Sequence, residues 1–124
     1  MILLDTNYLI RSLVEGSDES RRLDGWLLSH EELGTSAICW YEFLSGPVDD
    51  EGVELVKAFL RGNILPFTDV VAAESARLYD AAGRHCRLRI AATIAATAVT
   101  APAQLATANT EDFRPFVEFG LVLV

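Results

Sequence analysis

The chain has 124 residues, 51% of them hydrophobic, and this length predicts a single domain over residues 1–124 with a buried core. No apolar run approaches the roughly 20 residues that a membrane helix needs, and no basic region precedes the short apolar stretch at the N-terminus, so we expect a soluble, cytoplasmic protein without a membrane partner. The formal net charge of −8 argues against general electrostatic capture of nucleic acid, although an acidic site that binds cations, or a basic partner peptide, would suit this charge.

Short apolar runs alternate with helical segments along the chain, a pattern typical of a parallel sheet covered by helices. The predicted strands are residues 2–4, 33–35, 63–67, 104–107 and 119–124. The predicted helices are residues 6–15, 18–29, 37–45, 50–61, 69–84 and 90–100. The last of these helices is rich in Ala and Thr, so we expect it to be buried against the sheet.

The two cysteines, Cys39 and Cys86, lie in apolar or helical contexts and do not have the spacing of metal ligands. This usage fits reduced thiols in a cytosolic protein better than a disulfide framework. We therefore expect neither cysteine to be catalytic.

The N-terminal segment is the most informative part of the chain, because the apolar strand at 2–4 ends at an acid, Asp5, and then continues as a helix. The carboxyl ends of the strands line the ligand crevice of an open α/β sheet, so Asp5 would place its charge in that crevice. Asp5 is thus the first candidate for a functional residue. The alternative is that it only caps the helix beginning near Thr6.

Two later segments also combine apolar strand or helix residues with polar or acidic side chains. One runs over residues 35–46 and carries Glu42 on a helix that follows a strand; the other comprises residues 89–98 and then 105–113. In order, in spacing and in coverage of essentially the whole chain, these segments and residues 3–7 resemble the PIN-domain ribonucleases, most closely the VapC toxins of bacterial toxin–antitoxin pairs. Each motif is weak alone, but the full set in order is highly specific.

The resemblance implies a three-layer α/β/α fold in which helices flank a central parallel sheet, with a cleft of carboxylates that binds Mg²⁺ or Mn²⁺ and cleaves RNA endonucleolytically. By position it makes Asp5, Glu42 and Asp112 the catalytic acids, with Asp5 and Asp112 as metal ligands. Its polar supporting residues are Thr6, Asn7, Ser36, Thr107 and Asn109. Carboxylates suit this chemistry, because Mg²⁺ prefers hard oxygen ligands and a metal-bound water can attack phosphorus.

The resemblance also implies partners. A VapB-like antitoxin would neutralise the protein, RNA would be its substrate, and two copies would form a homodimer. DNA would be contacted only indirectly, through the antitoxin.

One position departs from the family pattern. Where that pattern has an acid two residues after the arginine at Arg89, this chain has Ala91. A methyl group can neither ligate a cation nor orient a water, so this acidic position is vacated and only three acids remain. The departure puts the activity of this sequence in question, though not its fold. The sequence leaves open whether Ala91 is natural or a substitution made to silence a toxic enzyme.

Other residues allow simpler interpretations. Arg84, His85, Arg87 and Arg89 form the one basic cluster, which a solvated helix end explains about as well as phosphate contacts do. The aromatic pair at 40–41 favours packing or a subunit interface over base stacking.

Other classes of protein also place an acid at the end of an apolar N-terminal strand. A phosphatase of the haloacid-dehalogenase type would need its second acid where Asn7 stands, and a phosphoacceptor receiver domain needs a late lysine, whereas the one lysine is Lys57, on a predicted helix. The stronger alternative is a catalytically inactive PIN-fold module that binds an antitoxin or RNA.

Overall fold

Five short strands form one sheet, and the computed structural model describes all of residues 1–124. The strands are β1 (Ile2–Leu4), β2 (Leu33–Ser36), β3 (Ile64–Leu65), β4 (Gln104–Ala106) and β5 (Val122–Leu123). Their order across the sheet is β3-β2-β1-β4-β5, and every neighbouring pair is parallel. β1 therefore lies at the centre, with Ile2 opposite both Leu33 and Gln104.

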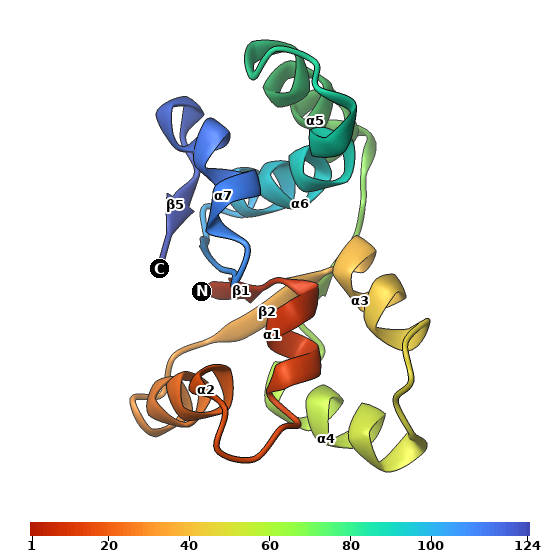
Figure 1. The fold of residues 1–124 in the computed structure, drawn as a ribbon, viewed down its shortest axis with the longest axis vertical. Helices are drawn as coiled ribbons and strands as arrows, with labels where there is room; N and C mark the ends of the chain where they lie inside the picture. The colour runs from red at the N-terminus through yellow and green to blue at the C-terminus, as the bar shows by residue number, and fades with distance from the viewer.

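Helices cover both faces of this sheet. They are α1 (Thr6–Arg11), α2 (Asp18–Leu28), α3 (Ala37–Leu44), α4 (Asp50–Leu60), α5 (Asp69–Ala81), α6 (Arg89–Thr100) and α7 (Thr110–Phe113). Figure 1 shows α1, α2 and α4 on one side of the strands and α5, α6 and α7 on the other. This arrangement confirms the predicted α/β fold with a central parallel sheet flanked by helices. None of the helices has the length and apolar character that crossing a lipid bilayer requires.

Side-chain caps explain where several of these helices begin. In each case an oxygen of the residue before the helix accepts a hydrogen bond from a backbone N–H of the first turn, which otherwise lacks a partner. The capping residues are Asp5, Ser17, Ser36, Asp49 and Thr68. α6 has no such cap, because the 3₁₀ segment η1 (Cys86–Leu88) runs directly into it.

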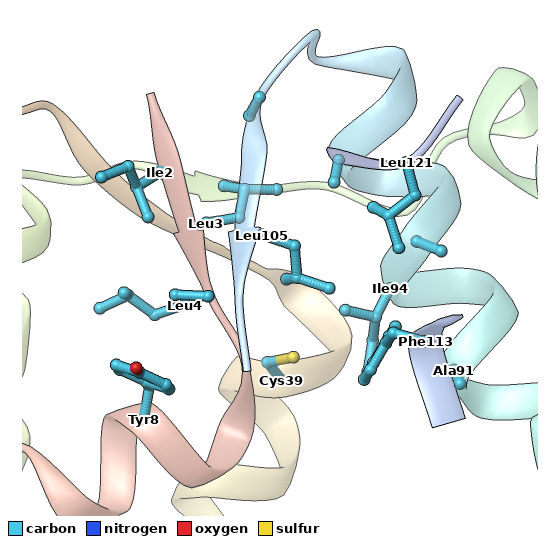
Figure 2. Close-up of a cluster of buried hydrophobic side chains, with 14 of the residues drawn as sticks. Ile2, Leu3, Leu4, Tyr8, Cys39, Ala91, Ile94, Leu105, Phe113 and Leu121 are labelled. Carbon is cyan, nitrogen blue, oxygen red and sulfur yellow. The ribbon is translucent and has the colours of Figure 1, made fainter. Parts of the chain in front are cut away.

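The core is built around β1 and α6. All three residues of β1 are buried, as expected for a strand covered on both faces. The buried side chains of α6 are mostly small: Ala91, Ala92, Ile94, Ala95, Ala96, Thr97 and Ala98. Short side chains let a helix lie close to the sheet, and α6 contacts β4 as predicted. Figure 2 shows Ile94 of α6 facing Leu105 of β4 within this cluster.

The first helix is shorter than the sequence predicted. The prediction covered residues 6–15, but α1 ends at Arg11. The Ser17 hydroxyl donates to the Arg11 carbonyl at 2.8 Å and so supplies a partner that a helix end lacks. Gly16 then adopts a φ of +80°, which a residue with a Cβ avoids, and the chain turns toward α2.

The C-terminal region also differs from the prediction. A strand was predicted over 119–124, but β5 contains only Val122–Leu123, and α7 and the 3₁₀ segment η2 (Arg114–Phe119) precede it. Pro115 stands in the first turn of η2, where its missing N–H needs no partner, and Gly120 ends η2 at a φ of +113°. The remaining elements begin and end within a few residues of the predicted ranges.

Candidate functional site

A cleft of about 270 Å³ lies at the carboxyl ends of β1 and β4. Its lining comes from the start of the chain, from α3, from η1 and α6, and from the segment after β4. The lining residues are Asp5, Thr6, Asn7, Glu42, Arg87, Ile90, Ala91, Ile94, Asn109, Asp112 and Phe113. The fold therefore brings the three candidate acids and the vacated position 91 into one cleft, although they are far apart in sequence.

Asp5 is the most buried of these acids, with 6% of its surface exposed. One carboxylate oxygen, Oδ1, accepts from the Thr6 N–H at 2.8 Å, and the other, Oδ2, accepts from the Thr107 hydroxyl at 2.7 Å. These donors offset the cost of burying the carboxylate and fix its orientation. Asp5 both caps α1 and lines the cleft, so its capping role does not exclude a role in the site.

Cys39 lies beneath the cleft and contacts Asp5, with its Sγ 3.5 Å from Oδ1. Burial, followed by the negative charge of Asp5, raises the pKa of the Cys39 thiol to about 12. The thiol therefore stays protonated near neutral pH and can donate to the carboxylate. No local sequence pattern indicates this contact, because the two residues are 34 positions apart. Both cysteines are free thiols, and Cys86 is exposed.

Thr6 connects Asp5 to Glu42. Its backbone N–H donates to Asp5, and its hydroxyl donates to Oε1 of Glu42 at 2.7 Å. Ser36 supports the same side of the site indirectly, because its hydroxyl accepts from the Cys39 N–H and caps α3, the helix that carries Glu42. Ser36 itself does not line the cleft, whereas Asn7 does.

Asp112 is held by a different kind of partner. Its Oδ1 accepts from Nη1 of Arg87 at 2.8 Å, and its Oδ2 accepts from the Asn109 side-chain amide at 2.9 Å. The Asn109 backbone N–H in turn donates to the Thr107 hydroxyl at 3.0 Å, and that hydroxyl donates to Asp5. A continuous chain of hydrogen bonds thus joins Asp112 to Asp5.

Ala91 forms part of an apolar wall of the cleft together with Ile94 and Phe113 (Figure 2), and it is 8% exposed. Across the whole chain, no three His, Cys, Asp or Glu side chains lie close enough together to hold a metal ion as a group.

The basic residues that are close together in the sequence have different partners in the structure. Arg87 lines the cleft, but Arg84 pairs with Asp80 at 3.6 Å, and Arg89 lies over the ring of Tyr79. Arg87 is the charged cleft residue that the sequence did not distinguish from its basic neighbours. Its partner Asp112 lies 25 residues away, so no local pattern marks the pair.

The parallel sheet flanked by helices, with acidic side chains in a cleft at its carboxyl edge, is the arrangement expected of a PIN domain. The PIN domain family model matches residues 2–116, and the chain belongs to this family. No curated protein matches the chain.

Solved structures are similar over nearly the full length of the chain. FitAcB from Neisseria gonorrhoeae is 27% identical, with a TM-score of 0.72 over 100% of this chain and 97% of that one. A toxin–antitoxin complex from Klebsiella pneumoniae is 26% identical, with a TM-score of 0.72 over 91% and 90% of the two chains. VapBC2 from Rickettsia felis, bound to a DNA fragment from its promoter, shares the fold at 18% identity, with a TM-score of 0.71 over 100% and 98%.

Proposed function

We propose that this protein is a VapC-like toxin with a metal-dependent endoribonuclease site, impaired by Ala91 and neutralised by a cognate antitoxin. The observation that carries the proposal is the meeting of Asp5, Glu42 and Asp112 in one cleft at the carboxyl edge of the sheet. Membership of the PIN family, whose members are generally nucleases, supports it. So does the similarity to a toxin–antitoxin complex at 26% identity.

The donor atoms of the cleft suit Mg²⁺ or Mn²⁺, because the carboxylates and the Thr6 hydroxyl all offer hard oxygen. Asp5 and Glu42, which both bond to Thr6, would hold such an ion, and Mg²⁺ in proteins is usually bound by one or two carboxylates and several waters. When bound, the ion would supply charge stabilisation to a phosphate under attack and lower the pKa of a water. Asp112, the other expected ligand, is engaged by Arg87.

The chain's own residues have defined tasks in this proposal. The donors from Thr6 and Thr107 fix Asp5, so that both of its oxygens keep one orientation in the cleft. Glu42 is the most exposed of the three acids. Its Oε1 is held by Thr6, and its carboxylate is free to accept a proton or orient a water. Asn109 keeps Asp112 at the cleft margin.

A second candidate function is a PIN-fold module that binds an antitoxin or RNA without turnover. The observation that favours it is the apolar wall at Ala91, Ile94 and Phe113, where the family pattern has an acid. Both candidates share the fold and the antitoxin, so only an activity measurement separates them.

The test is RNA cleavage in Mg²⁺ or Mn²⁺ by the protein as written, by Ala91→Asp, and by Ala91→Asp with Asp5→Asn. We expect little cleavage by the first protein, a gain on the order of 10²-fold or more in the second, and loss of that gain in the third. Asp80→Asn in the Ala91→Asp protein is the matched control, because Asp80 lies outside the cleft.

Two outcomes would revise the proposal. Robust cleavage by the protein as written, stopped by EDTA and lost in Asp5→Ala, would show that three acids suffice. Failure of Ala91→Asp to cleave any RNA would favour the binding module.

The partners follow from the same proposal. We infer a VapB-like antitoxin, an RNA substrate and a homodimer, with DNA contacted only through the antitoxin. The net charge of −8 suits a basic antitoxin segment, and an antitoxin Arg placed among the acids could form bidentate contacts with a carboxylate. Co-expression with the adjacent small gene tests the antitoxin directly.

A further inference from the structure

The cleft contains a cation of its own, the guanidinium of Arg87. It lies among the cleft-lining residues and donates to Asp112 at 2.8 Å. We propose that Arg87 and a divalent cation compete for Asp112, so that Arg87 weakens divalent-cation binding by this chain. The inference rests on the proposed function only in assuming that the cleft binds such an ion.

The hydrogen bonds of Asp112 are the first support for this competition. Arg87 takes one carboxylate oxygen and Asn109 takes the other, so both oxygens already have donors. Each oxygen keeps a second lone pair, so a divalent cation can still reach Asp112, but it would lie beside the guanidinium of Arg87 unless that donor moves away. Asn109 is a neutral partner that can shift at little electrostatic cost, whereas Arg87 carries a full positive charge that would face the incoming ion.

The position of the ion pair is the second support. The side chains of Arg87 and Asp112 are 62% and 33% exposed, so the pair lies at the open margin of the cleft and its arginine can swing into solvent. Exposed ion pairs contribute little net free energy and exchange readily. A competing cation can therefore displace Arg87, which makes the effect a change in affinity and not a complete block.

The vacated position strengthens the effect. Arg87 stands four residues before Ala91, about one helical turn away, and both line the cleft. With alanine at 91, Asp112 is the carboxylate within the cleft to which Arg87 bonds. The cleft thus keeps three carboxylates and one internal cation, and the part not neutralised is the pair Asp5 and Glu42.

Arg84 provides a matched control. It lies three residues before Arg87 and carries the same charge, but it pairs with Asp80 and does not line the cleft. If Arg87 acts only through the overall charge of the protein, removing either arginine will have the same effect. If it acts by occupying Asp112, only its own removal will matter.

The experiment is calorimetric titration of the purified full chain with Mn²⁺ alone, without RNA or antitoxin. The variants are Arg87→Gln, Arg84→Gln, Asp112→Asn and the double variant Arg87→Gln with Asp112→Asn. We expect Arg87→Gln to bind Mn²⁺ on the order of tenfold more tightly than the protein as written, because a repelling charge is removed and a carboxylate is released. Arg84→Gln should stay within about twofold. The double variant should lose the gain.

Equal or weaker Mn²⁺ binding by Arg87→Gln would overturn the inference. So would a gain that persists without Asp112, or the absence of Mn²⁺ binding in every protein tested. Arg87→Lys, which keeps the charge as a more mobile ammonium, serves as a second variant. Its Mn²⁺ affinity should lie between that of the protein as written and that of Arg87→Gln. Since no RNA is present, a failure here is distinct from a failure to cleave RNA.

Discussion

The two ends of the cleft hold their carboxylates in different ways. Asp5 is buried and is held by neutral donors, namely the Thr6 N–H, the Thr107 hydroxyl and the Cys39 thiol. Asp112 lies at the margin and is held by a guanidinium. A neutral donor orients a carboxylate and leaves its negative charge uncompensated, whereas an arginine compensates that charge. The Asp5 end is therefore the part of the site best prepared for a cation.

The largest expected effect concerns the antitoxin. If an antitoxin Arg binds in the cleft, it will use the carboxylates that are not already paired. We expect Asp5→Asn combined with Glu42→Gln to weaken the complex about 100-fold, and Asp112→Asn to weaken it less than about tenfold. The measurement is titration of each purified variant with the antitoxin that the proposed function assigns to this protein.

Asp80→Ala, which removes an acid outside the cleft, is the control for loss of net charge. Equal affinity for the double variant and the protein as written would show that the acids do not anchor the antitoxin.

The link between the two ends gives the next largest effect. The Thr107 hydroxyl donates to Asp5 and accepts from the Asn109 N–H, and Thr107 is 6% exposed. Thr107→Val leaves both partners without a buried hydrogen bond, so we expect a loss of about 1–2 kcal/mol in the free energy of unfolding. Chemical denaturation measures this. Thr93→Val is the control, because its exposed hydroxyl bonds only within α6, and we expect a change within about 0.5 kcal/mol.

High pH should act on the Asp5 end through the Cys39 thiol. The pKa of Cys39 rises from 9.0 to about 12 in the folded protein, so the folded state keeps its proton more tightly than the unfolded chain does. The resulting stability is complete below pH 9 and falls as the pH rises toward 12, by up to about 1.4 kcal/mol per pH unit.

Unfolding at several pH values above 9 tests this effect of Cys39, with Cys39→Ala and Cys86→Ala for comparison. The slope should flatten in Cys39→Ala but not in Cys86→Ala, since Cys86 is exposed. Identical slopes in all three proteins would contradict the prediction.

The smallest effect comes from restoring an acid at position 91. Ala91→Asp would add a carboxylate to the cleft and increase the repulsion among its acids. In EDTA we expect the melting temperature to fall by a few degrees, for a loss of about 1 kcal/mol. Added Mn²⁺ should stabilise this variant more than the protein as written. Identical Mn²⁺-dependent shifts in both proteins would place residue 91 outside the metal site.

Much of the fold was predictable because its signals are local. The strand ending at Asp5, the cap at Ser36 and the small residues of α6 each lie within a few positions of one another. The early end of α1 was not predictable in this way, because it depends on Ser17 reaching back to the Arg11 carbonyl.

In the site too, residues marked by a sequence motif were predictable, whereas contacts between distant segments were not. The sequence suggested the three acids by family position, and the fold brings them into one cleft, while their catalytic roles stay predictions. Arg87 was grouped with its neighbours, since its distinctive contact is with Asp112, across 25 residues of chain. The Cys39 contact with Asp5 was missed for the same reason, because it spans 34 residues.

The central place of β1 has a consequence for synthesis. β1 is made well before β4, with which it pairs, and Asp112 follows β4. A growing chain on the ribosome therefore carries Asp5 long before it can carry the complete cleft. If the protein is a toxin, the topology itself delays the assembly of its site until translation has passed residue 113, the last residue that lines the cleft.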